Sequence, residues 1–166
     1  MAFVLPENLH EDLYPLAWMI GTWAGTGRCE YPGIDPFDFA QEVSFNHDGR
    51  NFLNYYSRTW KIDENKDIIE PFEFESGFWS LRDKKILEVV IAQNIGINQG
   101  WVGIVDGAKI QLALDRAYST QSASIVDSGQ RLYGNVEGEL FFAYDMGMNG
   151  HDMQAYMWSS LARKAD

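Results

Sequence analysis

The stretch Leu16–Phe45 constrains the fold of this chain more than any other part of the sequence. Within it, Gly25 and Gly27 occupy alternate positions, close behind Gly21 and the large aromatic residue Trp23. Alternate glycines let a strand bend sharply and let a second backbone approach closely. The tryptophan beside them fills the space that the glycines leave. This pattern predicts an antiparallel sheet that curls into a closed barrel.

The rest of the chain has the pattern of short strands separated by turn signals, of which Asp106-Gly107 and Glu137-Gly138 are typical. A short helix capped by Asn8 and interrupted by Pro15 is expected to close one end of the barrel. The sequence therefore predicts an all-β fold in one domain spanning residues 1–166. This fold is an up-and-down antiparallel barrel of about ten strands. The expected strands are a run beginning at Thr22, then Phe37–Phe45, Phe52–Lys61, Phe72–Ser80, Ile86–Ala92, Ile95–Gly103, Lys109–Leu114, Ser122–Tyr133, Glu139–Met148 and Met153–Arg163.

Acidic residues outnumber basic ones by 24 to 13, which gives the chain a net charge of -11. Such a surface repels the phosphates of nucleic acids and anionic membranes, so neither is an expected partner. The single cysteine, Cys29, excludes an internal disulfide and is compatible with a reducing compartment. The N-terminal segment lacks a signal-peptide pattern, and no apolar run approaches the ~20 residues of a membrane span. A cytoplasmic location is therefore expected.

No catalytic or metal-binding motif stands out. The histidines His10, His47 and His151 are too scattered for metal-ligand spacing, and a G-x-S-x-G nucleophile motif is absent. We therefore expect no catalytic residues and no metal site from motifs alone. Glu73 and Glu75 alternate along one strand, and the expected place for these two carboxylates is a solvated outer face.

A barrel of this size holds one small apolar ligand, and its last two strands supply the expected pocket wall. Tyr144, Met146 and Met148 alternate along one strand face, and methionine suits contact with a large planar ligand. In the last strand, simple alternation places Tyr156 and Trp158 on one face. These five residues form the predicted wall of the ligand site.

The last strand also ends in an arginine, Arg163, which is expected near a barrel rim. There it is predicted to stack over Trp23 and seal one end of the barrel by a cation–π contact. The predicted structural signature therefore comprises Gly21, Trp23, Gly25, Gly27 and Arg163.

These features together resemble the nitrobindin family over about residues 9–163. The matching residues are Leu16 through Trp23, Gly25, Gly27, Glu30-Tyr31-Pro32, Pro36-Phe37, Glu42, Phe45, His47-Asp48-Gly49, Phe52-Leu53, Tyr55, Arg58-Thr59-Trp60, Glu75 through Trp79, and Tyr144-Asp145-Met146. The resemblance implies a ten-stranded antiparallel barrel, similar in shape to lipocalins and fatty-acid-binding proteins. It also implies that the barrel holds ferric haem near one end, binds nitric oxide and isomerises peroxynitrite to nitrate. It also implies that a histidine of the last strand holds the iron, in a pattern resembling His-Leu-x-x-x-Leu-x-Arg.

The chain departs from the family at that histidine. Counting back from Leu161 and Arg163 places the histidine position at Tyr156. The loop before this strand, Met148–Met153, also lacks the family's Gly-Gln-Pro-Leu segment. Three interpretations remain open. The barrel no longer binds haem and the tyrosine packs inside it, the tyrosine itself ligates ferric haem as phenolate, or His151 substitutes as the ligand.

The leading hypothesis for function is a nitrobindin-like barrel that binds a small apolar or amphiphilic molecule without haem, and therefore is not an enzyme. One alternative is a ferric haem protein, a peroxynitrite isomerase, with Tyr156 or His151 on the iron. Another is a carrier of fatty acids or similar amphiphiles, with Arg58 or Arg131 as the inward cation. The cofactor and a homodimeric state are both left open.

Overall fold

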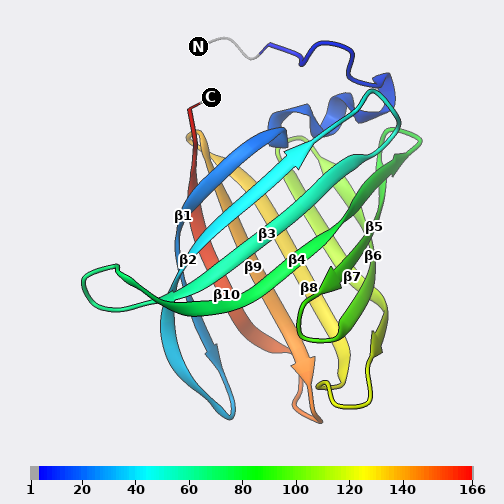
Figure 1. The fold of residues 1–166 in the computed structure, drawn as a ribbon. Helices are drawn as coiled ribbons and strands as arrows, with labels where there is room; N and C mark the ends of the chain where they lie inside the picture. The colour runs from blue at the N-terminus through cyan, green and yellow to red at the C-terminus, as the bar shows by residue number, and fades with distance from the viewer. Residues whose placement is uncertain (1–3, 166) are drawn as a thin grey trace.

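The ten strands form one closed antiparallel barrel, in which the first strand pairs with both the second and the last. The computed structural model describes residues 4–165. Strands follow each other around the barrel in chain order (Figure 1), so the predicted up-and-down architecture is confirmed. The elements are η1 (Glu11–Met19), β1 (Gly21–Tyr31), β2 (Ile34–Asn46), β3 (Leu53–Ile62), β4 (Ile68–Arg82), β5 (Ile86–Gln93), β6 (Ile97–Asp106), β7 (Lys109–Ser119), β8 (Val126–Val136), β9 (Glu139–Met148) and β10 (Gln154–Arg163).

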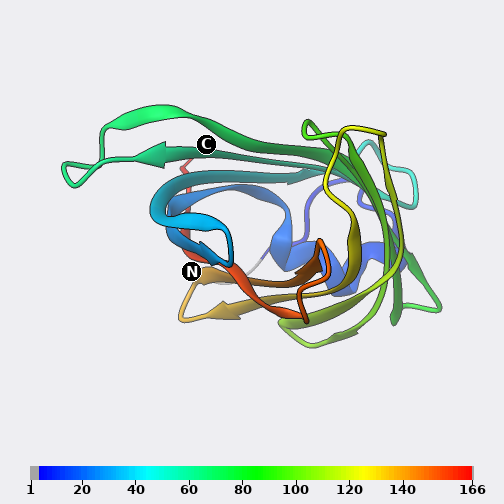
Figure 2. The ribbon, with the colours of Figure 1, turned by 90° about the horizontal axis from the view of Figure 1, so that it is seen from below.

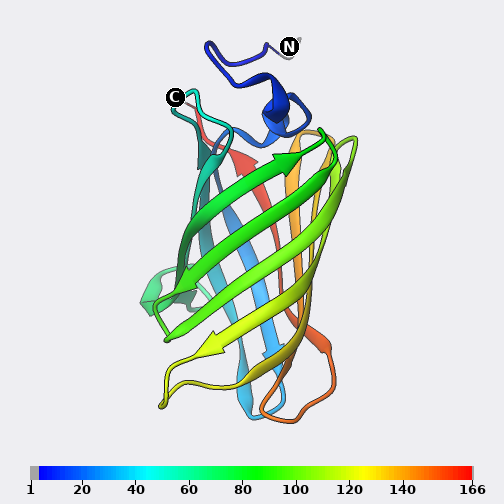
Figure 3. The same ribbon diagram turned by 90° about the vertical axis from the view of Figure 1, so that its right-hand side faces the viewer.

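The short helix η1 is a 3₁₀ helix that lies across one end of the barrel (Figures 1 and 3). It buries Leu13 and Met19 in the barrel core, and the backbone carbonyl of Met19 accepts a hydrogen bond from Trp23 Nε1 at 2.8 Å. The predicted cap was wrong. His10 caps the helix by accepting a hydrogen bond from the amide of Asp12, whereas Asn8 has a φ of 60° in the turn before it. Closure of one end by a short helix is confirmed.

Close approach of β1 to β10 explains the alternate glycines. A Cβ atom added to Gly25 would lie 2.2 Å from the carbonyl oxygen of Ser160, and one added to Gly27 would lie 2.2 Å from that of Trp158. Both contacts fall on β10, which pairs with β1 to close the barrel. The glycines are therefore needed where the first and last strands meet.

Arg163 seals the end of the barrel that η1 covers. Its guanidinium lies 4.1 Å from the ring centre of Trp23, which confirms the predicted cation–π contact. The same guanidinium donates to the backbone carbonyl of Trp18 at 2.7 Å and to that of Ile20. A Cβ at Gly21 would meet this guanidinium, so the glycine leaves room for the arginine.

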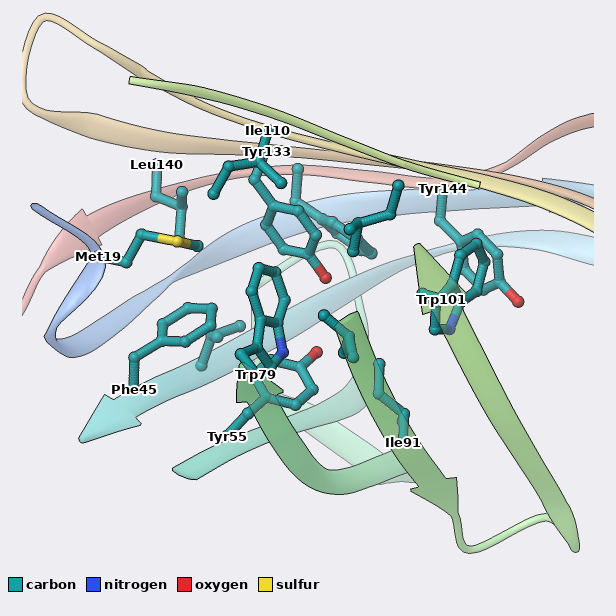
Figure 4. Close-up of a cluster of buried hydrophobic side chains, with 14 of the residues drawn as sticks. Met19, Phe45, Tyr55, Trp79, Ile91, Trp101, Ile110, Tyr133, Leu140 and Tyr144 are labelled. Carbon is teal, nitrogen blue, oxygen red and sulfur yellow. The ribbon is translucent and has the colours of Figure 1, made fainter. Parts of the chain in front are cut away.

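Aromatic side chains fill the barrel on the side of η1 (Figure 4). Trp79 lies at the centre, with edge contacts to the rings of Phe45 at 5.1 Å and Tyr133 at 5.1 Å. Tyr55 packs against the same indole at 5.6 Å. The same buried cluster continues to the opposite end of the barrel, where it includes Tyr31, Tyr144 and Tyr156.

We expect Arg163→Ala to destabilise the protein by about 1–2 kcal/mol, because it removes the stacking on Trp23 and two hydrogen bonds to backbone carbonyls. Urea denaturation followed by circular dichroism measures this change. Arg163→Lys is the matched control, since it keeps the charge but lacks the planar fork, and it should recover only part of the loss. An unfolding free energy equal to that of the wild type in the alanine variant would contradict this role.

Candidate functional site

Two glutamates of β4 point into the barrel, so the predicted outer position of Glu73 and Glu75 was wrong. Only 5% of Glu73 and 9% of Glu75 is exposed. Both lie an even number of residues from Trp79 and Leu81, and therefore on the same face of β4 as these two fully buried core residues. Period-two alternation from the tryptophan would have placed the carboxylates inside, and this signal was present in the sequence.

Glu75 is paired with a buried arginine from β8. Arg131 has no exposed area, and its Nη1 and Nη2 donate to the two carboxylate oxygens of Glu75 at 2.8 and 2.6 Å. Tyr55 adds a hydroxyl donor to this carboxylate at 2.8 Å. Burial acts to raise the pKa of Glu75, but the charge of Arg131 and the hydrogen bonds it accepts outweigh this effect and lower the pKa.

Glu73 lies beside this pair but accepts hydrogen bonds only from neutral groups among the described residues. Tyr156 donates its hydroxyl at 2.8 Å, and Gln93 donates Nε2 at 2.7 Å. The same Gln93 nitrogen also donates to Glu75 at 2.6 Å, so one amide bridges the two carboxylates. Burial, together with the charge of Glu75, raises the pKa of Glu73 to about 7.

A β-bulge turns Tyr156 toward Glu73. The pairing of β10 with β9 shifts register between Ala155 and Met157, so Tyr156 and Met157 are both buried although they are neighbours. Alternation then resumes, and Trp158 lies on the outer surface, 39% exposed. The prediction that Trp158 shares the pocket wall with Tyr156 was therefore wrong, because one extra residue reverses the strand's facing.

Trp158 instead contributes to a groove on the outside of the barrel. This groove has a volume of about 850 Å³ and crosses β1, β10, β9 and β8, and its lining also includes Phe141 and Leu132. The hairpin between β3 and β4, which projects from the barrel in Figure 2, supplies Asp63 and Lys66 to its lining. The groove is separate from the interior side chains around Glu73.

The other predicted wall residues do lie inside the barrel. Tyr144 and Met146 are buried and Met148 is partly buried, all on β9. The ring of Tyr156 makes edge contacts with Tyr144 at 5.4 Å and with Tyr31 of β1 at 5.7 Å. The structure therefore brings Tyr156 together with β9 residues and adds an aromatic residue of β1 that the predicted wall lacked.

His151 lies at the same end of the barrel, in the loop between β9 and β10. Its imidazole is exposed and makes an edge contact with Tyr31 at 5.9 Å. Because Tyr31 in turn contacts Tyr156, His151 is separated from the barrel interior by one aromatic ring.

The residues present do not fit a haem iron held by Tyr156. Phenolate ligation requires the phenol to lose its proton, and this hydroxyl donates that proton to a carboxylate. Burial and the charge of Glu73 raise the pKa of Tyr156 well above its usual value of 10. Within residues 4–165, no cluster of three or more His, Cys, Asp and Glu side chains is placed to hold a metal ion.

Sequence reasoning missed the polar network that surrounds Tyr156. Its members are Glu73, Glu75, Gln93, Gln99 and Arg131, which come from β4, β5, β6 and β8. Gln99 connects this network to β9, because it accepts from Arg131 at 3.2 Å and donates to Tyr144 at 3.0 Å. Contacts between such distant strands have no local signal.

A closed antiparallel barrel with polar and aromatic side chains at one end defines a class of small-molecule-binding barrel proteins. Comparison with known families is more specific. Residues 12–163 match the family model described as the THAP4-like, heme-binding beta-barrel domain, and the chain belongs to this family, the nitrobindins. The resemblance seen in the sequence is thereby confirmed.

Curated relatives agree with this assignment. The chain is 39% identical to a peroxynitrite isomerase of a Nocardioides species, over 99% of this chain and 100% of the relative. It is 37% identical to a ferric nitrobindin-like protein of Streptomyces avermitilis, over 96% and 84% respectively. The crystal structure of Rv2717c from M. tuberculosis superposes with a TM-score of 0.85 at 30% identity, covering 95% of this chain and 99% of that one.

Among the described residues, no helix is long and apolar enough to cross a bilayer.

We expect Arg131→Met to destabilise the protein by roughly 3–5 kcal/mol, because it leaves the buried Glu75 carboxylate without its cation. Urea denaturation measures the loss. The double variant Arg131→Met with Glu75→Gln removes both charges and should recover a large part of it. Equal losses in the single and double variants would show that packing, rather than charge, accounts for the effect.

The raised pKa of Glu73 makes stability depend on pH. The folded state holds a proton on Glu73 up to a pKa of about 7, whereas the unfolded state releases it near the ordinary value of 4.5. Stability from this group is therefore present below pH 4.5 and lost as the pH rises to about 7. Glu73→Gln should flatten this part of the stability curve in urea denaturation at several pH values. Parallel curves for wild type and variant would contradict the assignment.

Proposed function

We propose that this chain is a small-molecule-binding barrel of the nitrobindin family that does not hold haem iron through residue 156. Tyr156 occupies the position at which the family resemblance places the iron-ligating histidine. The observation that carries the proposal is the hydrogen bond of 2.8 Å that the Tyr156 hydroxyl donates to Glu73. It keeps the phenol neutral, and a neutral phenol is a poor ligand for ferric iron.

The proposed ligand is a small apolar or amphiphilic molecule at the barrel end opposite η1. Buried apolar side chains gather there, those of Tyr31, Tyr144, Tyr156 and Met146, and the Tyr156 hydroxyl and Glu73 supply polar groups inside the barrel. A mostly apolar lining with a few fixed polar groups is the usual composition of a small-molecule site. On this proposal the chain is a binding protein rather than an enzyme.

A fatty-acid carrier has less support. Such a carrier needs an inward cation for the ligand's carboxylate, and both candidates are unsuitable. Arg58 is exposed, and Arg131 is inside but already bound through both Nη atoms to Glu75. A fatty acid would have to displace this buried pair, at a cost of several kcal/mol.

Titration with ferric haem tests the proposal. We expect the wild type to give no sharp Soret band at one equivalent. Tyr156→His should gain such a band, because it restores the family's ligand and Glu73 is placed to accept the second imidazole N–H. Tyr156→Phe is the matched control and should remain without a band, while circular dichroism verifies that each variant folds.

A Soret band in the wild type that disappears in Tyr156→Phe would overturn the proposal in favour of tyrosine ligation. Failure of a folded Tyr156→His variant to bind haem would remove residue 156 as the ligand position, and with it the argument from that position.

The second candidate function is a ferric haem protein that acts on peroxynitrite. Two observations favour it: the relatives that carry the name peroxynitrite isomerase, and the position of His151 against Tyr31, which contacts Tyr156. This candidate predicts a wild-type Soret band that survives Tyr156→Phe and disappears in His151→Ala.

A further inference from the structure

The barrel interior contains its own example of cation recognition. Arg131 is bound by one carboxylate, Glu75, and its guanidinium lies over aromatic faces, 4.3 Å from the ring centre of Tyr144 and 4.9 Å from that of Trp101. A carboxylate together with aromatic rings is a typical arrangement for binding a desolvated cation. The fold therefore stabilises one positive charge in its interior in this way.

A second carboxylate with the same kind of surroundings has no cation. Glu73 is buried, and the ring of its hydrogen-bond partner Tyr156 packs against Tyr31 and Tyr144. Among the described residues, Arg131 forms its ion pair with Glu75, not with Glu73. Among the described residues, the interior thus holds two carboxylates and one guanidinium, so Glu73 has no cation of its own when it is ionised.

In the part of the chain that the structure describes, the groups that contact Glu73 or act on its charge are acidic or neutral, with one exception. The exception is Arg131 of β8, whose charge is shared with Glu75. The remaining groups are the Cys29 thiol on β1, Thr59 on β3, Glu75 on β4, Gln93 on β5, Tyr144 on β9 and Tyr156 on β10. Burying a carboxylate in this setting is costly unless it takes up a proton or a cation.

We propose that the Glu73 end of the barrel binds a small organic cation, an ammonium group carried on an apolar or aromatic body, with Glu73 as its counter-ion. The ammonium would occupy beside Glu73 the role that Arg131 has beside Glu75, and the rings of Tyr31, Tyr144 and Tyr156 would contact its apolar part. This inference rests on the proposed small-molecule function and names the chemical class of its ligand.

Two further features agree with a cationic ligand. The net charge of -11 raises the concentration of cations near the surface and speeds their association. The barrel end near Tyr156 is the one that η1 does not cover, and Figure 2 views the molecule from that side. The residues of the β9–β10 loop there, His151 and Met153, are exposed.

A proton and the cationic ligand compete for Glu73. Because the pKa of this group is raised to about 7, lowering the pH through 7 protonates it and removes the counter-ion. Binding of the cation should therefore weaken as the medium becomes acidic, and it should displace a proton from the fraction of molecules in which Glu73 is protonated.

Isothermal titration calorimetry with 2-phenylethylamine and its neutral analogue 2-phenylethanol tests the inference. At pH 8 we expect the amine to bind the wild type at least about tenfold more tightly than the alcohol, as for one charge-assisted contact. Glu73→Gln should reduce amine affinity to that of the alcohol. The control Glu64→Gln makes the same change of charge on an exposed loop and should leave both affinities unchanged.

A measurement on the wild type alone keeps the inference testable if Glu73→Gln fails to fold. Amine titrations at pH 6.5 in buffers of different ionisation enthalpy should reveal proton release, which the alcohol should not cause. Equal affinity for amine and alcohol, or an amine affinity that Glu73→Gln does not change, would overturn the cation inference while leaving small-molecule binding intact. Failure of both molecules to bind would also overturn it. The haem titration decides the proposed function separately.

Discussion

The buried ion pair between Arg131 and Glu75 is the interaction on which the interior of this barrel depends. A guanidinium without exposed area can remain in an apolar interior only when a carboxylate meets it with good geometry. Both Nη atoms satisfy this requirement through Glu75, and Trp101 and Tyr144 cover the cation. This pair accounts for one of the two inward carboxylates of β4 and leaves the other, Glu73, without a cation of its own among the described residues.

In this protein, the residues that close the barrel are different from the residues of the candidate site. Closure of β1 on β10, the end helix and the stacking of Arg163 on Trp23 all maintain the barrel, and the family model, which matches residues 12–163, includes both closing strands and Arg163. The candidate site at the other end contains Tyr156, whose hydroxyl donates a hydrogen bond to Glu73. The interior residues of this end do not take part in the closure of the other end, so they can vary without opening the barrel there.

Several elements were predictable because their signals are local. Spacing along the chain was enough to predict the structural roles of Gly25, Gly27, Trp23 and Arg163. Each of these residues acts on its own strand or on the strand paired with it. The inward direction of Glu73 and Glu75 was also predictable, because they lie on the same strand face as the buried Trp79. The general preference of carboxylates for solvent favoured the opposite prediction. The helix cap was misplaced by two residues, from Asn8 to His10, because both positions precede a plausible first turn.

The sequence by itself determined the barrel and its strand order, because these follow from period-two patterning, turn residues and the glycines at the closing strands. The family followed from the motifs that resemble the nitrobindins. The sequence also placed a tyrosine where the family resemblance expects a histidine. Only the tertiary structure decided what that tyrosine does. The bulge at Ala155–Met157 reverses the facing of β10, and the partner of Tyr156 lies 83 residues away on β4. A hydrogen bond between such distant strands depends on register and barrel closure, which local sequence patterns do not encode.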